Sequence, residues 1–177
     1  MSEVCKVALD AMGGDNAPSE VVHGAVNAAQ KENDIKIFLV GKKVEIEQEL
    51  SKYSYNKEQI EIVDAAEVIE TGEPPVMAVR RKKESSLVKA MYLVKDGTAD
   101  AFVSAGSSGA ILVGGQTIVG RIKGVERPPM APLIPTAKGV SLLVDSGGNV
   151  DARPSFLVQW AKMGSIYIEN IEGIKNP

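Results

Sequence analysis

Residues 4–18 read VCKVALDAMGGDNAP, and this transition already indicates the architecture of the chain. The first seven residues are mostly apolar and end in Asp10, as is typical of a strand that is covered on both faces. A glycine-rich turn follows, in which Asn16 is suited to a helix cap. Pro18 then suits the first helical position, where its missing N–H is tolerated. A strand, a glycine-rich turn and a helix in this order predict the first unit of an α/β fold.

The same alternation continues along the chain. Short apolar or β-branched runs predict strands, and the segments between them show helical periodicity. The predicted strands are residues 4–10, 34–40, 59–63, 100–104 and 140–145. The predicted helices are residues 18–32, 42–52, 75–95 (as one helix or two), 108–122 and 154–168. Residues 127–135 are proline-rich and suit either a rigid connection or lid, or a plain extended connector. The alternation predicts an α/β sandwich with a mostly parallel sheet.

Glycine-rich turns of similar design follow three of the predicted strands. They are residues 10–18, residues 104–109 (SAGSSG) and residues 145–154 (DSGGNVDARP). Glycine lets backbone N–H groups approach a ligand closely, and a helix N-terminus adds free donors and partial positive charge. In a parallel sheet all three turns would lie at one edge, beyond the carboxyl ends of the strands. We therefore expect a groove for phosphate or another oxyanion at that edge.

Each turn taken alone has a second interpretation, namely an ordinary tight turn that binds nothing. None contains the Gly-Lys-Ser/Thr of a Walker loop, and Gly-x-Gly-x-x-Gly does not follow the first strand. Four aspartates border the turns: Asp10, Asp15, Asp145 and Asp151. A carboxylate beside a phosphate site binds a metal, acts as an acid or base, or accepts N–H bonds that organise a turn. We expect the turn-organising role for Asp15 and Asp151.

A run of four cations, Arg80-Arg81-Lys82-Lys83, lies on or ends the helix that starts near Pro75. Such a run usually forms a solvated face. In the alternative interpretation, one or two of the cations reach the anion groove and the others meet an acidic partner. Arg121, Lys123 and Arg127 form a looser basic set that would extend this surface.

Composition excludes several classes of function. The 177 residues carry a net charge of -3, which argues against nucleic-acid binding over the whole surface. A single cysteine and a single histidine exclude an internal disulfide, a multi-cysteine zinc site and a two-histidine metal site. We expect Cys5 to be a small buried residue and His23 to have a structural or surface role. Residues 101–120 carry no charge, but half of them are Gly, Ser, Gln or Thr, so they predict a strand, a turn and a buried helix rather than a membrane span.

Five motifs together resemble the PlsX-type phosphate acyltransferases of bacterial phospholipid synthesis. They are residues 10–18, 75–86 (PVMAVRRKKESS), 104–110 (SAGSSGA), 119–124 (VGRIKG) and 143–154. The resemblance covers essentially the whole chain and preserves the order and spacing of the motifs. The family usually has Asn-Thr where this chain has Ser107-Ser108, and its third turn usually places the aspartate one step from Asp145. Because the family's chains are longer, the resemblance implies that residues 1–177 are the N-terminal part of an α/β domain whose C-terminal half is absent from this chain.

The resemblance implies a three-layer α/β/α sandwich, similar to the isocitrate dehydrogenase and phosphotransacetylase folds. It implies a transferase of fatty acid and phospholipid metabolism that moves a fatty acyl group from acyl-[acyl carrier protein] to inorganic phosphate, with no cofactor and no metal-ligating residue assigned to the site. The expected partners are acyl carrier protein, inorganic phosphate and a second copy in a homodimer, but not nucleic acid. The expected location is the cytoplasm, with peripheral membrane association through the missing half.

The site expected for this chemistry needs no serine or cysteine nucleophile, because phosphate is itself a competent nucleophile. The protein must hold phosphate against the thioester and stabilise the developing oxyanion. The residues expected to act in catalysis are Asp10, Asp15, Arg81, Lys82 and Asn149. The residues expected to bind phosphate or substrate are Gly13, Gly14, Ser104, Gly106, Ser107, Ser108, Gly109 and Gly148.

Two other functions remain open on the sequence. One is a phosphotransacetylase-like enzyme that uses acyl-coenzyme A as the acyl donor. The other is a fragment that binds an anion or a carrier protein without turnover. The cationic run suits an acidic carrier protein better than a nucleotide carrier, and a comparison of the two acyl donors would separate the enzymes.

Overall fold

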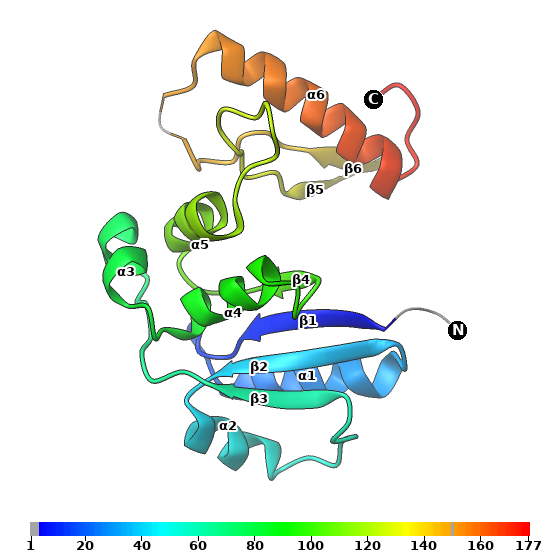
Figure 1. The fold of residues 1–177 in the computed structure, drawn as a ribbon. Coiled ribbons are helices and arrows are strands. Elements are labelled where there is room, and N and C mark those ends of the chain that lie inside the picture. Colours follow the sequence, from blue (N-terminus) through cyan, green and yellow to red (C-terminus); the bar gives the residue numbers. More distant parts are fainter. Residues whose placement is uncertain (1–3, 150) are drawn as a thin grey trace. The chain divides into compact units, whose positions relative to one another are not determined.

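The computed structural model describes residues 4–149 and 151–177. The chain divides into two compact units, Met1–Gly120 (unit 1) and Arg121–Pro177 (unit 2), and each is described by itself. Figure 1 shows the order of their elements along the chain.

Unit 1 contains a four-stranded parallel sheet. Its strands lie in the order β3-β2-β1-β4 and are β1 (Cys5–Asp10), β2 (Ile35–Gly41), β3 (Ile60–Asp64) and β4 (Ala101–Val103). All four correspond to predicted strands. The chain moves outward from β1 through β2 to β3 and then returns to place β4 on the other side of β1. The reversal makes a switch point between β1 and β4, and ligands of such sheets bind beyond the carboxyl ends of the strands there.

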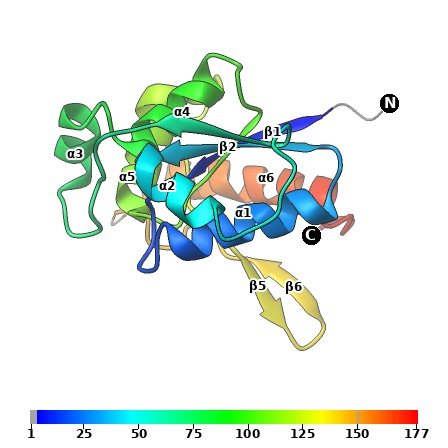
Figure 2. The same ribbon diagram turned by 90° about the horizontal axis from the view of Figure 1, so that it is seen from below.

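Helices cover both faces of this sheet. One face is covered by α1 (Ser19–Lys31) and α2 (Lys43–Leu50), and the other by α4 (Ser86–Lys95). Figure 2 shows the sheet nearly edge-on between these layers. Beyond α4 lie α3 (Pro75–Arg81) and α5 (Ser108–Gly114), which continues as the π-helix η1 (Gly115–Val119). The predicted three-layer α/β/α arrangement with a mostly parallel sheet is therefore confirmed.

The strand β2 shows why both faces are covered. Its alternating side chains point to opposite faces, and residues of both sets are buried. Ile37 and Leu39 pack in the core beneath α1, whereas Phe38 and Val40 pack on the α4 side. Complete burial of a side chain such as Leu39 contributes about 1.5–3 kcal/mol.

Unit 2 is a two-stranded antiparallel hairpin and a long helix. The hairpin pairs β5 (Leu133–Thr136) with β6 (Gly139–Leu142), and the helix is α6 (Pro154–Ile171). The prediction that residues 140–145 form a strand of the parallel sheet is therefore wrong. Thr136 pairs with Gly139 across a two-residue connection, which can join only antiparallel strands because a parallel crossover needs a dozen residues or more.

Several local expectations also change. Cys5, the first residue of β1, is exposed rather than buried. Pro18 stands at the N-cap position of α1 instead of the first helical position, and it makes no side-chain capping bond. Residues 75–95 form two helices, and the Ser85 hydroxyl caps the second by accepting a hydrogen bond from the Val88 amide. The helix predicted at 108–122 is half-buried rather than buried, with Ala110, Gly114 and Ile118 inside.

The charge-free residues 101–120 form β4, a turn, α5 and η1, so the predicted strand, turn and helix are present, although the helix is half-buried. Among the helices of the described residues, none has both the length and the hydrophobicity that crossing a bilayer requires.

Candidate active site

The ends of β1 and β4 meet through a buried carboxylate. Leu9 and Val103 are paired in the register of the two strands, so Asp10 and Ser104 are the next residues on neighbouring strands. Ser104 Oγ donates a hydrogen bond of 2.8 Å to Asp10 Oδ2. Asp10 is only 2% exposed. A buried carboxylate is stable only when hydrogen-bond donors of this kind contact it.

The same two side chains also organise the turns that follow them. Asp10 Oδ1 accepts a hydrogen bond of 3.2 Å from the Met12 amide. Ser104 Oγ accepts one of 3.0 Å from the Gly106 amide. The contacts Asp10–Met12, Asp10–Ser104 and Ser104–Gly106 form one network, which we call the Asp10–Ser104 junction. It fixes the first and second glycine-rich turns against each other at the switch point.

Glycine is required at this junction because the two turns touch. A Cβ on Gly13 would lie 2.7 Å from Asp10 Oδ2 and 2.8 Å from the Gly106 amide nitrogen. At the start of α5, a Cβ on Gly109 would lie 2.6 Å from Pro75 Cγ. The space left by these missing side chains is filled by protein atoms, so Gly13 and Gly109 serve close packing of the turns and helices. Gly14 differs, because it has a φ of +110° and is exposed.

Several backbone donors of the two turns remain free within the described residues. Within residues 4–149 and 151–177, no acceptor is found for the amides of Gly14, Ser108 and Gly109. Ser107 is buried and caps α5, its Oγ accepting a hydrogen bond of 3.3 Å from the Ala110 amide. Ser108 is exposed, so its hydroxyl lies at the surface next to these amides. Free amides at a helix start are suited to an oxyanion.

The third glycine-rich turn belongs to unit 2 and is organised by Asp145. This carboxylate accepts hydrogen bonds from the Met130 amide (2.6 Å) and from the amide and side chain of Asn149 (2.7 and 2.9 Å). Partial burial raises the pKa of Asp145, but the hydrogen bonds from Met130 and Asn149 outweigh it and hold the pKa below its ordinary value. Asn149 Oδ1 in turn accepts from Arg127 Nε at 2.5 Å.

The structure thus brings together two of the three predicted turns. Asp10, Gly13, Ser104 and Gly106 are in mutual contact, and Gly14, Ser107, Ser108 and Gly109 lie in the same two turns. Asn149 and Gly148 lie in the turn of unit 2. Asp15 and Asp151 are exposed in their turns, and their expected organising roles stay predictions. His23 lies on α1, where its ring stacks on Tyr53.

The cationic run divides into one engaged and three exposed side chains. Lys82 Nζ contacts Glu73 Oε1 at 2.5 Å and donates to the Val68 carbonyl at 2.7 Å. The hydrogen bond from Lys82 holds the pKa of Glu73 below its ordinary value. This contact ties the end of α3 to the segment that precedes it. The sequence analysis did not identify Glu73. Glu73 lies nine residues before Lys82, and this spacing matches no helix or strand period that would predict a contact.

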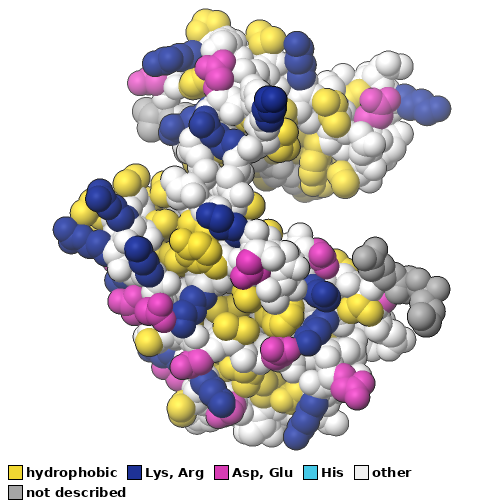
Figure 3. Space-filling model, viewed as in Figure 1, with side chains coloured by type: hydrophobic (Ala, Val, Ile, Leu, Met, Phe, Trp, Pro, Cys, Tyr) yellow, Lys and Arg dark blue, Asp and Glu magenta, His cyan; other side chains and the backbone are white. Residues whose placement is uncertain are grey.

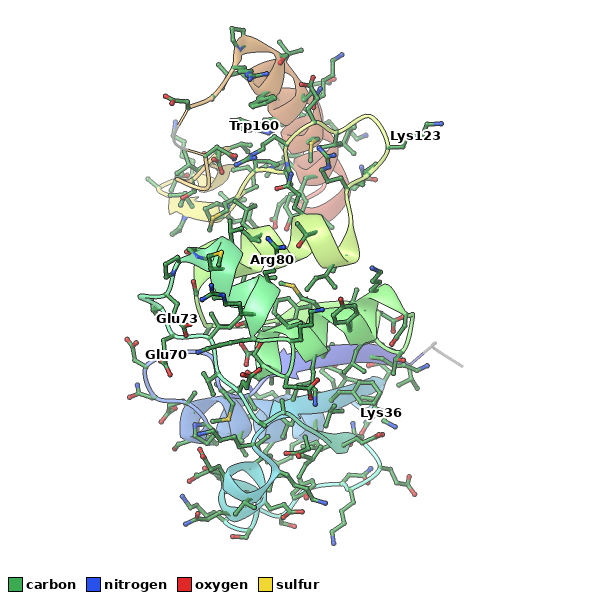
Figure 4. The ribbon with its side chains drawn as sticks, turned by 60° about the vertical axis from the view of Figure 1, so that its left-hand side comes forward. Lys36, Glu70, Glu73, Arg80, Lys123 and Trp160 are labelled. Carbon is green, nitrogen blue, oxygen red and sulfur yellow. The ribbon has the colours of Figure 1, made fainter. Side chains whose placement is uncertain are left out.

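Arg80, Arg81 and Lys83 are exposed and form no ion pair with another residue of the described segments. Figure 3 shows cationic side chains gathered over α3, and Figure 4 shows Arg80 on this helix with Glu70 and Glu73 in the segment before it. Val76 and Met77 are also exposed on α3, at 63% and 40%. Val76 lies four residues before Arg80, and Met77 lies four residues before Arg81. Residues at this spacing are neighbours on a helix, so the four side chains share one face. We call Val76, Met77, Arg80 and Arg81 the α3 face.

Comparison with known proteins decides the family. Residues 5–177 match the model of a family described as "Fatty acid synthesis protein". The chain belongs to this family. The resemblance to phosphate acyltransferases is confirmed by relatives of that name. One from Clostridium beijerinckii is 53% identical over 172 residues, covering 97% of this chain and 52% of the relative. One from Clostridium kluyveri is 56% identical over 171 residues, covering 97% of this chain and 51% of the relative.

The chain therefore spans about half the length of the curated relatives it matches. Among solved structures, a phosphotransacetylase from Streptococcus pyogenes is similar in fold, with a TM-score of 0.66 at 20% sequence identity. The match covers 96% of this chain and 55% of that one. At this identity the likeness supports the fold and carries no argument about the substrate.

Proposed function

We propose that this chain is part of an enzyme that transfers a fatty acyl group from acyl-[acyl carrier protein] to inorganic phosphate, producing acyl phosphate for phospholipid synthesis. The observation that carries the proposal is the Asp10–Ser104 junction. It holds two glycine-rich turns together at the switch point of the sheet, where the amides of Gly14, Ser108 and Gly109 are free to bind an oxyanion. The phosphate acyltransferases among the relatives give the proposal its reaction class.

The reaction does not require a strong general acid or base from the protein. A phosphate oxygen attacks the thioester carbonyl carbon, a C–O bond forms and the C–S bond breaks. Sulfur leaves as a thiolate, which then takes a proton from water, so a strong general acid is not required. Negative charge develops on the carbonyl oxygen in the transition state. Preorganised amides that are stronger donors to this oxyanion than to the ground state lower the barrier.

The described contacts suggest a role for each predicted residue of unit 1. Asp10 and Ser104 are positioning residues, because their polar atoms are engaged in holding the turns. Ser108 supplies a hydroxyl beside the free amides. Arg81 is a better candidate than Lys82 for neutralising phosphate charge, since Lys82 is held by Glu73. In unit 2, Asn149 is held by Asp145, and its catalytic role stays a prediction.

The α3 face favours a carrier protein over a nucleotide carrier as the acyl donor. It combines two exposed apolar side chains with two arginines that form no ion pair with any other residue the structure describes. An acidic protein surface with apolar residues would complement both features, whereas a nucleotide phosphate would use the charges alone.

Phosphate binding can be tested on this chain directly by NMR. Titration with inorganic phosphate should shift the amide resonances of Gly14, Ser108 and Gly109. The amide of Gly97, in an exposed turn with a φ of +80°, is the matched control and should not shift. Equal shifts at all four amides, or none at any of them, would contradict the anion site.

Turnover requires a second assay, because this chain spans half of its relatives. Acyl phosphate formation should be measured with the chain alone and with the complementary half of a relative, using acyl carrier protein or coenzyme A as the donor. Preference for coenzyme A would support the phosphotransacetylase-like alternative. Phosphate binding without turnover in either mixture would support a binding fragment. Gly14→Val is a poor probe here, since its φ of +110° strains any side chain.

A further inference from the structure

The described residues of unit 2 bury few hydrophobic side chains. Among its described residues, the buried hydrophobic ones are Trp160 and Ile168. Large hydrophobic residues that are exposed in this unit are Ile122, Ile134, Leu143, Leu157, Val158, Ile166, Tyr167, Ile171 and Ile174. A hairpin of two strands is marginal by itself and needs further strands or helices for stability. Unit 2 therefore exposes apolar surface that a self-sufficient unit would bury.

The helix α6 shows the same deficit on opposite faces. Leu157 is 53% exposed and lies on the face toward β6, whereas Ile166 is 63% exposed and lies about 180° away at a turn of 100° per residue. A helix that is apolar all round is normally buried on every side. In unit 2 only one side of α6 faces the hairpin, and the side chains there do not fill the space between the two elements.

The incomplete packing leaves an apolar groove between β6 and α6, with a volume of about 520 Å³. Leu142 and Val144 line it from the hairpin side, and Leu157, Trp160 and Ile168 line it from α6. Trp160 projects from α6, and its Nε1 donates to the Arg127 carbonyl at 2.8 Å (Figure 4). The polar edge of the indole is thus satisfied within the unit.

We propose that this groove is the docking site of a second polypeptide segment, equivalent to the half of the phosphate acyltransferase relatives that this chain does not span. The relatives are about twice as long as the matched region, so a segment of sufficient size exists in the family. The lining is aliphatic and aromatic, which fits core side chains. The free edges of the β5–β6 hairpin offer backbone groups for added strands. This inference rests on the apolar groove of unit 2 and does not depend on the proposed function.

The test is reconstitution from two parts. The full 177-residue chain is co-expressed with the unmatched half of the Clostridium beijerinckii relative, and the product is analysed by light scattering. We expect a one-to-one complex and a changed emission of Trp160, the single tryptophan of this chain. Hydrogen exchange of 139–144 and 154–171 should slow on complex formation. In the complex, Leu157→Ser should weaken affinity by about ten-fold or more, because it removes an apolar side chain from the interface.

Ile166→Ser is the matched control, since it makes the same kind of change at similar exposure on the opposite face of α6. It should change the affinity by less than about two-fold. The helical circular dichroism of both variants in the free chain shows whether they remain folded.

Several outcomes would overturn the proposal. These are the absence of a complex, equal losses for the two variants, or slowed exchange elsewhere but not in the groove. A self-dimer disrupted by Leu157→Ser would assign the groove to a second copy of this chain. A Trp160 response to fatty acid alone would assign it to an acyl chain. Complex formation is read without turnover, so a failure of the proposed function would leave this result unaffected.

Discussion

The carboxylate of Asp10, at the end of β1, has a structural role in holding the two turns. Its position at the switch point suits catalysis, but its oxygens accept hydrogen bonds from Met12 and Ser104. A carboxylate that is 2% exposed is buried at low cost only while these donors remain. The stability of the two turns should therefore depend on single hydroxyl and amide groups.

Replacing Ser104 with alanine should lower the free energy of unfolding by about 1–3 kcal/mol, because Asp10 would lose a partner in a buried setting. Urea denaturation followed by circular dichroism measures the change. Ser108→Ala is the control, since Ser108 is exposed, and it should alter stability by about 0.5 kcal/mol or less. Equal stability of the two variants would show that the junction contributes nothing.

Two glycines should respond to alanine in opposite directions. Gly13→Ala should destabilise unit 1 by about 1–3 kcal/mol, because its Cβ would overlap Asp10 Oδ2 and the Gly106 amide. Gly24→Ala, on an exposed position of α1 with no atom within 4 Å of the added Cβ, should stabilise it by about 0.5–1 kcal/mol. Thermal unfolding of both variants measures the difference, and a stabilising Gly13→Ala would refute the packing role.

At the scale of elements, α3 and α5 form a pair whose contact depends on Gly109 and Pro75. Ala78 and Val79 are the buried residues of α3. The opposite side of the helix, which carries the α3 face, is therefore turned to solvent. The Lys82–Glu73 contact closes the C-terminal end of the helix. These packing contacts, rather than the cationic run itself, decide which charges remain available to a partner.

Reversing one charge on the α3 face should weaken carrier-protein binding. Arg81→Glu is expected to reduce affinity for acyl carrier protein by about ten-fold at low salt, and the difference should shrink as ionic strength rises. Surface plasmon resonance at two salt concentrations measures both effects. Lys57→Glu makes the same charge change at an exposed residue outside α3 and should have little effect. Equal losses would indicate a general charge effect.

The turn organised by Asp145 should open in acid. The pKa of Asp145 is lower in the folded state than the ordinary value of 3.8, so its contribution to stability is present above 3.8 and is lost as the pH falls through the lower folded value. Trp160 fluorescence should report the opening of this turn. The Trp160 indole donates a hydrogen bond to the Arg127 carbonyl, and the Arg127 side chain donates one to Asn149. The Trp160 emission should change below pH 3.8 in the wild type. Asp145→Asn should lack this acid transition, and its retention would contradict the assignment.

At the scale of the whole molecule, the two units differ in how complete they are. Unit 1 has a sheet covered on both faces and hydrophobic clusters on each side. Unit 2 has two buried hydrophobic residues among those described and an open apolar groove. Sequence periodicity predicted α6 and its Pro154 start correctly, because both depend on local pattern. It could not predict that the helix would keep several apolar side chains exposed.

The sequence by itself determined the α/β class, the four parallel strands of unit 1 and the two turns that follow β1 and β4. These features depend on hydrophobic period, glycine and proline, whose effects act over a few neighbouring residues. Tertiary structure alone decided that Asp10 meets Ser104, ninety-four positions away, and that Lys82 is held by Glu73. It also decided that residues 139–142 pair with 133–136 in an antiparallel hairpin. Strand pairing and side-chain contacts of this kind depend on which segments pack together, and an apolar run carries no information about its neighbour.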